Sequence, residues 1–233
     1  MLQNADGTLA NKFVIVANIA PTDGGEQIIS GNLKVASARL EDAMFFYMDD
    51  SSKTMESYLP QLAKVIYHKD FGSYEKRLAV VRKYAFEVGR TFSVDAAKLD
   101  KAIALAKVDL VMHTVKEMPE LQGLIGYYCA LANGINEEIA IAIRDQYKPA
   151  GPSDSLPGNE LAKVVAVAEK LATLDILFSL GIKPTGSKDP YAQRRAAIGI
   201  IRILGLEQLE NCLNMLSVSE EVKQFICDRK DGL

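Results

Sequence analysis

Residues 161–182 read LAKVVAVAEKLATLDILFSLGI, and this apolar stretch decides how the rest of the chain is interpreted. Four charged residues interrupt it, at Lys163, Glu169, Lys170 and Asp175. A helix that spans a bilayer needs about 20 consecutive, mostly apolar residues with few or no charges. The stretch therefore predicts a buried helix of a globular fold and not a membrane span.

The sequence on either side of this stretch is also helical, from Val35 almost to the last residue. Ser73 precedes a helical pattern, and Asn136 and Ser219 each precede two acidic residues, which is typical of a helix start. Residues 148–159 contain three prolines and two glycines and predict a long surface loop. The pattern predicts helices at 37–49, 54–68, 74–89, 94–106, 108–117, 122–132, 137–147, 160–180, 190–204, 206–216 and 219–229.

Residues 1–36 have a different pattern. Residues 13–19 are rich in valine, isoleucine and phenylalanine, as strands are. Turn signals lie on both sides, at Asp6-Gly7 and at Asp23-Gly24-Gly25. We therefore expect a mainly α protein with a short N-terminal β-hairpin appendage. Because a hairpin alone is marginally stable, these strands are expected to pack on the helices or to belong to a larger sheet.

Composition limits the classes of function. The chain has 233 residues, 48% of them hydrophobic and 24% charged, with a net charge of −3 and a pI near 5.5. These values are typical of a soluble globular protein, in which any contact with nucleic acid is local. Three cysteines without CxxC spacing and an N-terminus without a signal-peptide pattern predict a cytoplasmic location.

One segment departs from this acidic balance. Between residues 183 and 202 five basic residues face a single acid, Asp189. Gly186 predicts a tight turn, Asp189 a helix cap and Pro190 the first residue of the helix. An anionic partner is the main interpretation of the basic residues, which are Lys183, Lys188, Arg194, Arg195 and Arg202.

Four blocks of sequence carry a family resemblance. Residues 184–195 read PTGSKDPYAQRR and are similar to a "PTGSxDPxALRR" pattern. FVIVANI at 13–19 with IISGN at 28–32, EMPELQG at 117–123 and AEKLATL at 168–174 are similar to "FVANI…IISGN", "EFPELQG" and "ADKLDTL". All four patterns occur in this order in the β subunit of the bacterial two-subunit glycyl-tRNA synthetase, which the chain resembles over nearly its whole length.

The resemblance implies a function and partners. The ligase joins glycine to tRNA(Gly) with ATP and Mg, and its adenylate-forming site lies on a separate α subunit. The chain is then expected to bind or position tRNA and to support assembly with the α subunit, without catalytic residues or a cofactor of its own. The family's β subunit is about three times longer, so we interpret the chain as an internal fragment. Its expected parts are a strand remnant at 1–36, a helical domain at 37–205 and the start of a C-terminal helical region at 206–233.

The helical domain resembles the HD superfamily of metal-dependent phosphohydrolases. That superfamily holds a divalent metal with two histidines and two aspartates, including a His-Asp dipeptide. This chain has only His68 and His113, no His-Asp dipeptide, and Glu169 where the last aspartate is expected. We expect His68, Asp109 and Glu169 to be remnants of that site that bind no metal, and a working phosphohydrolase stays the alternative.

The remaining sequence features do not indicate a catalytic site. His113 lies four residues after Asp109 in a predicted helix, so the simplest interpretations are a hydrogen bond between the two or a half-exposed histidine near the C-terminus of that helix. The sequence has no GxxxxGK[ST], GxGxxG or GxSxG motif.

The basic residues between 183 and 202 could contact tRNA, contact the α subunit or a neighbouring domain, or pair with acids inside the fold. A purely architectural spacer is therefore a second alternative.

Overall fold

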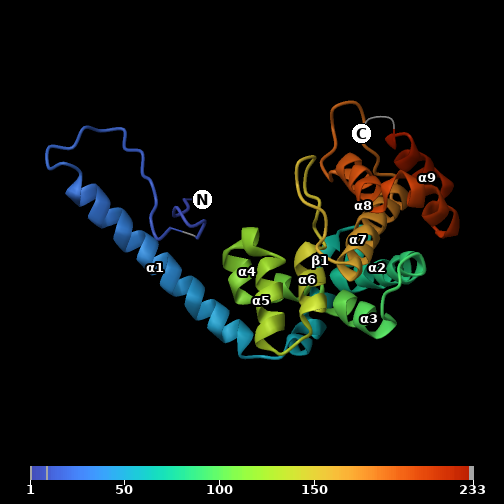
Figure 1. The fold of residues 1–233 in the computed structure, drawn as a ribbon, viewed down its shortest axis with the longest axis horizontal. Helices are drawn as coiled ribbons and strands as arrows, with labels where there is room; N and C mark the ends of the chain where they lie inside the picture. The colour runs from blue at the N-terminus through green and yellow to red at the C-terminus, as the bar shows by residue number, and fades with distance from the viewer. Residues whose placement is uncertain (1, 9, 231–233) are drawn as a thin grey trace. The chain divides into compact units, whose positions relative to one another are not determined.

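The structure is a computed structural model that describes residues 2–8 and 10–230, and it is mainly α-helical (Figure 1). The chain divides into two compact units, Met1–Met44 and Phe45–Leu233. The α-helices are α1 (Glu26–Ser51), α2 (Tyr74–Gly89), α3 (Ala96–Leu105), α4 (His113–Glu117), α5 (Leu124–Ala132), α6 (Glu137–Asp145), α7 (Glu160–Ser179), α8 (Gln193–Met215) and α9 (Glu220–Cys227). The 3₁₀ helices are η1 (Met55–Lys64), η2 (Val108–Val111) and η3 (Pro119–Leu121).

The N-terminal β-hairpin that the sequence predicts is not formed. Residues 13–19 lie outside any strand, and Val14 and Val16 are exposed. A strand needs a neighbouring strand to pair its N–H and C=O groups, and this segment has none within the part of the chain that the structure describes. The helix predicted from residue 37 begins earlier, at Glu26, because the Asp23 carboxylate accepts hydrogen bonds from the N–H groups of Gly25 and Gln27 (3.0 and 3.1 Å).

The apolar stretch at 161–182 forms the centre of the second unit, as predicted. It forms α7, whose side chains are buried on nearly every side by α2, α6 and α8. The Asn159 side chain caps this helix by accepting from the Ala162 N–H (2.7 Å). Figure 1 shows α7 among these three helices. Most residues on α7 are therefore buried, and this low exposure includes the charged side chains of Glu169 and Lys170.

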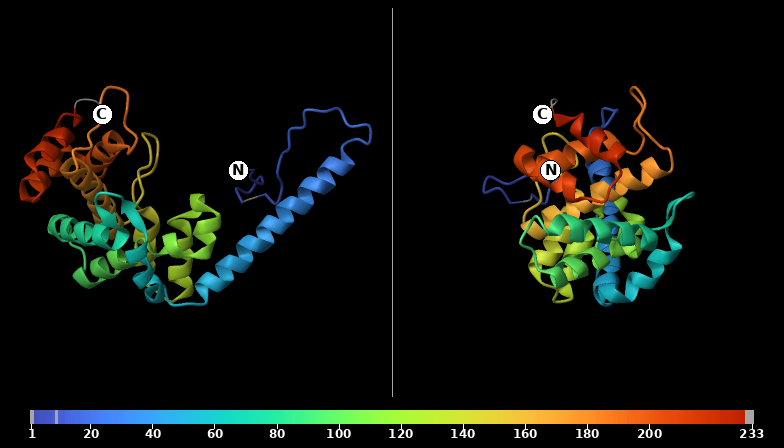
Figure 2. Two further views of the ribbon diagram at one scale, coloured as in Figure 1. Left: turned by 180° about the vertical axis from the view of Figure 1, so that it is seen from behind. Right: turned by 90° about the vertical axis from the view of Figure 1, so that its right-hand side faces the viewer.

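The C-terminal helices lie at one end of the second unit, with the loop at 148–159 beside α8 (Figure 2). Helix α8 is interrupted at Gly205 (φ 71°, ψ 162°), as the predicted break between 190–204 and 206–216 requires. Arg202 ties the loop to α8, because its guanidinium donates to the carbonyls of Gly151 and Asp154 (2.7 and 2.8 Å).

The predicted helix at 54–68 is wrong at its C-terminal end. Strands β1 (Ile66–His68) and β2 (Gly72–Ser73) pair there as a short antiparallel hairpin. Gly72 lies at φ 120°, a conformation that a helix cannot contain and that glycine adopts most easily. The mainly α class is thus observed, whereas the HD-like classification and the domain limits near 36 and 205 stay predictions.

Two glycines allow the helix packing to be tested. A methyl group at Gly126 on α5 would lie 2.7 Å from Cγ2 of Ile143 on α6, whereas one at Gly31 on α1 would meet nothing within 4 Å. We expect Gly126→Ala to lower the free energy of unfolding by about 1–3 kcal/mol through overpacking. Gly31→Ala should instead raise it by up to about 1 kcal/mol, because alanine favours the helix. Urea unfolding measures both, and equal effects would contradict the close α5–α6 contact.

Candidate functional site

The basic segment begins with the tight turn that Gly186 predicts. Thr185 and Lys188 exchange backbone hydrogen bonds across it (3.1 and 2.8 Å), with Gly186 at φ 49°. Asp189 caps the next helix by accepting from the N–H groups of Gln193 and Arg194 (2.8 and 2.9 Å). The helix therefore starts at Gln193 and not at Pro190, because Ala192 adopts a left-handed conformation (φ 53°) that delays the first turn.

Three of the five candidate tRNA-binding residues already have partners. Arg202 donates to the two loop carbonyls described above. Arg194 donates to the Gly186 carbonyl (2.7 Å) and so braces the turn. Lys183 forms an exposed ion pair with Glu221. These contacts hold the segment in shape, and the two arginines keep their full positive charge because carbonyl groups do not neutralise it.

The other two candidates, Lys188 and Arg195, are exposed. No carboxylate pairs with either of them, or with Arg194 or Arg202, in residues 2–8 and 10–230. The sequence could not separate free arginines from arginines paired with acids inside the fold. Positive charge thus remains available on this surface, which we call the basic face and define by Lys188, Arg194, Arg195 and Arg202.

Glu169, the first remnant candidate, lies in a buried ionic cluster. Its carboxylate contacts the Arg77 guanidinium at 2.5 Å and the Lys107 ammonium at 3.4 Å, and all three residues are at most 5% exposed. Arg77 also donates to the Glu169 carbonyl (3.2 Å) and to the Thr173 hydroxyl (2.9 Å). Two side chains from α2 and the start of η2 thus supply the positive charge around this carboxylate.

The charges in this cluster shift one another's protonation. Burial alone would raise the pKa of Glu169, but Arg77 and Lys107 outweigh it and hold that pKa below its ordinary value. Burial lowers the pKa of Lys107 to about 8, against the opposing attraction of Glu169. Burial would also lower the pKa of Arg77, yet Glu169 raises it above its ordinary value. At neutral pH the cluster therefore holds a carboxylate and two cations.

The other two remnant candidates do not join Glu169 as a set of ligands. Asp109 is fully buried and accepts a short hydrogen bond from the Gly123 N–H (2.5 Å), and burial raises its pKa. His68 ends β1, accepts from the Asp70 N–H through Nδ1 (3.2 Å) and packs edge-on against Tyr191 (6.0 Å between ring centroids). In the described part of the chain the three do not form a group close enough to share one ion.

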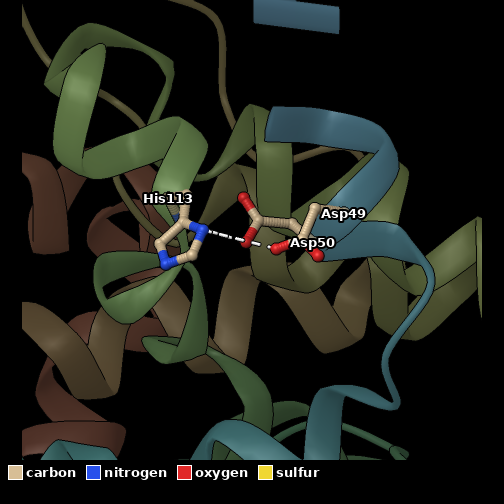
Figure 3. A group of neighbouring side chains, drawn as sticks. All are labelled: Asp49, Asp50 and His113. Atoms are coloured by element: carbon tan, nitrogen blue, oxygen red, sulfur yellow. Dashed lines mark hydrogen bonds and ion pairs between the residues drawn. The ribbon is translucent and has the colours of Figure 1, made fainter. Parts of the chain in front are cut away.

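A different acidic group lies close together, at Asp49, Asp50 and His113 (Figure 3). Both Asp50 oxygens are occupied, because they accept from the N–H groups of His113 and Thr114 and from the hydroxyls of Thr114 and Tyr58 (2.7–3.2 Å). Asp49 pairs with Lys53 at 2.7 Å and with His113 Nδ1 at 3.3 Å. These contacts explain the group as a cap on α4.

The predicted hydrogen bond between His113 and Asp109 is wrong. Asp109 belongs to η2 and His113 starts α4, and the extended backbone of Met112 (φ −74°, ψ 149°) separates the two helices. The four-residue spacing therefore does not bring them onto one helix face. No local signal pairs His113 with the end of α1, since the contact joins residues far apart in the sequence.

The comparisons with known proteins agree with the resemblance. The family model described as glycyl-tRNA synthetase beta subunit matches residues 1–232. The glycine–tRNA ligase beta subunit of Methylobacillus flagellatus is 44% identical over 248 aligned positions, which cover 99% of this chain and 35% of that relative. The protein of the same name from Nitrosomonas europaea is 49% identical over 217 positions, covering 92% of this chain and 30% of the relative.

The chain belongs to the glycyl-tRNA synthetase beta subunit family. It spans about a third of the length of the curated relatives that it matches. Within the residues that the structure describes, no helix combines the length and the apolar character needed to cross a membrane.

Proposed function

We propose that this chain is part of the β subunit of a glycine–tRNA ligase, and that the complete enzyme joins glycine to tRNA(Gly) with ATP and Mg in the cytoplasm. Family membership and the printed names of the relatives support this proposal. The ATP-dependent step is assigned to a separate α subunit, which is the second proposed partner. The chain contributes no catalytic residue of its own.

The chain's own part in this reaction is to bind and position tRNA through the basic face. The observation that carries this proposal is that Arg195 is exposed and that its guanidinium has no carboxylate partner in the part of the chain that the structure describes. Lys188 lies in the neighbouring turn and is likewise exposed, without a carboxylate partner among the described residues. Lysine and arginine contacts to phosphate supply most of the affinity for the backbone of double-helical RNA.

The two alternatives are less well supported. A metal-dependent phosphohydrolase would need Glu169 as a ligand, but its carboxylate already pairs with Arg77 and Lys107. Displacing these two buried cations for a metal ion would leave their charge uncompensated. A spacer role predicts that the basic face does not affect tRNA binding, and the following experiment decides this.

We expect the double substitution Lys188→Glu and Arg195→Glu to raise the KM for tRNA(Gly) by about tenfold or more in the assembled ligase, with little change in kcat. The reason is the loss of two phosphate contacts, which should also reduce the slope of log affinity against log salt by about 1–2. Aminoacylation kinetics at several salt concentrations measure both quantities.

Lys116→Glu is the control for charge reversal, because Lys116 is exposed on α4 and lies outside the basic face. It should leave the KM for tRNA and the salt slope within about twofold of the unmodified enzyme. Unchanged tRNA kinetics in the double variant would favour the spacer. A weaker association of the two subunits, with tRNA affinity unchanged, would assign the basic face to the α subunit.

A further inference from the structure

A cavity of about 610 Å³ lies in the second unit, beside the buried cluster at Glu169. Parts of α2, α7 and the start of α8 line it, together with the loop that follows α6. Its wall carries more positive than negative charge. The cationic side chains are Arg77, Lys107, Arg144, Lys170 and Arg195, and the acidic ones are Glu120 and Glu169.

Part of this positive charge is neutralised within the protein. Arg77 pairs with Glu169 at 2.5 Å, and Arg144 pairs with Asp145 at 2.7 Å. Lys107 has only a longer contact with the same Glu169 oxygen, at 3.4 Å, and lies 4.0 Å from the centroid of the Tyr147 ring. The single carboxylate of Glu169 is thus the counter-charge of two buried cations.

Lys170 and Arg195 have no carboxylate within ion-pair distance among the residues that the structure describes. Lys170 is 8% exposed, and its ammonium donates to the Lys148 carbonyl at 2.6 Å, which uses one of its three donors. Two donors on the cavity wall are also buried without an acceptor in residues 2–8 and 10–230, namely the neutral Tyr147 hydroxyl and the Nε–H of the Arg77 guanidinium.

Buried charges and donors without partners are costly, so native proteins usually compensate them. Burial outweighs the attraction of Glu169 at both lysines and lowers the pKa of Lys107 and of Lys170 to about 8. An anion in the cavity would supply both the negative charge and the missing acceptors. The cavity therefore has the properties of a site that is completed by an anionic group.

We propose that this cavity binds a phosphate monoester, held by Lys170, Lys107 and Arg195. A phosphate monoester carries up to two negative charges and three terminal oxygens, which match three cations and several free donors better than a single carboxylate does. The group is carried either by a free nucleotide or by the 5′ end of an RNA strand. Arg195 also belongs to the basic face, so the proposal is tested with a ligand other than tRNA, and its failure can be told apart from failure of the tRNA-binding role.

The test is calorimetric titration of the complete chain with AMP, with adenosine as the uncharged control. We expect AMP to bind saturably at one site per chain and adenosine not to bind. Lys170→Met and Arg195→Ala should each weaken AMP binding by at least about tenfold, since each removes a charge-assisted contact. Lys163→Met, on the outer side of the same helix, should change it by less than about twofold.

The pH dependence gives a second readout. Arg77, Glu169 and Asp109 face Lys107, while Glu169, Lys107 and Asp154 face Lys170. Since both lysines lose their protons in the free protein above about pH 8 and phosphate prefers the charged form, affinity should fall by about tenfold or more between pH 7.5 and 9.5. Lys170→Met should show a shallower decline.

The source of the group is decided by competition with bound AMP. Displacement by a 5′-phosphorylated RNA oligonucleotide, but not by its 5′-hydroxyl form, assigns the site to an RNA end, and displacement by neither assigns it to a free nucleotide. The proposal is overturned if AMP does not bind, if adenosine binds equally well, or if Arg195→Ala leaves binding unchanged. Because Arg195 is exposed, its variant is informative even if Lys170→Met does not fold.

Discussion

Glu169→Gln is expected to lower the free energy of unfolding by about 3–5 kcal/mol, as found when one partner of a buried ion pair is removed. The variant keeps the shape of the side chain but leaves Arg77 and Lys107 buried without a counter-charge. Urea unfolding at neutral pH measures the effect.

The matched control is Glu160→Gln on the same helix. Glu160 pairs with Lys163 at the exposed start of α7, and an exposed pair contributes at most about 1 kcal/mol. The double variant Glu169→Gln with Lys107→Met should recover part of the lost stability, because it removes one of the two uncompensated cations. Equal, small effects at positions 160 and 169 would contradict the buried cluster.

The same cluster should affect acid stability. The folded pKa of Glu169 lies below its ordinary value of 4.5, so the stability from its charged form is complete above that pH. This stability is lost as the pH falls through the folded pKa, where the carboxylate gains a proton. In Glu169→Gln this loss of stability on acidification should be absent, because the glutamine side chain does not gain a proton in this pH range.

The second large effect is expected at Asp50. Asp50→Ala should lower the free energy of unfolding by about 2–4 kcal/mol, because it leaves two N–H groups at the start of α4 and the Thr114 hydroxyl without their acceptor and removes the carboxylate contact of the Tyr58 hydroxyl. Thermal unfolding followed by calorimetry gives the enthalpy from which this change in the free energy of unfolding is calculated.

The neighbouring Asp49 is the control, since its pair with Lys53 is partly exposed. Asp49→Ala should change stability by no more than about 0.5–1 kcal/mol. If both variants lost the same stability, and divalent metal ions raised the melting temperature of the unmodified protein alone, the three residues would be a metal site and not a helix cap.

The sequence predicts the helices of the second unit well because their signals are local. The apolar pattern of 161–182 and the caps at Ser73, Asn136 and Ser219 depend on neighbours within one turn, and all four appear in the structure. The strand prediction at 13–19 is wrong because strand composition cannot supply a pairing partner. The helix start at Glu26 had a local signal in Asp23, followed three residues later by that glutamate, which is a capping pattern.

The candidate site was predictable only in part. The sequence identifies Lys188 and Arg195 as basic residues near a turn, but which cations remain free depends on contacts such as those of Arg202 with the loop carbonyls. The surroundings of Glu169 could not be predicted from the sequence for the same reason. Arg77 and Lys107 lie on other elements, and only the packed fold brings their charges to this carboxylate.

The cluster at Glu169 has a consequence for how the core is maintained. The cations that balance this carboxylate are covalently part of the polypeptide, so they arrive with every newly made chain at a fixed ratio. Neither dialysis nor a chelator can strip them away. The charge of this carboxylate is therefore balanced by the polypeptide itself.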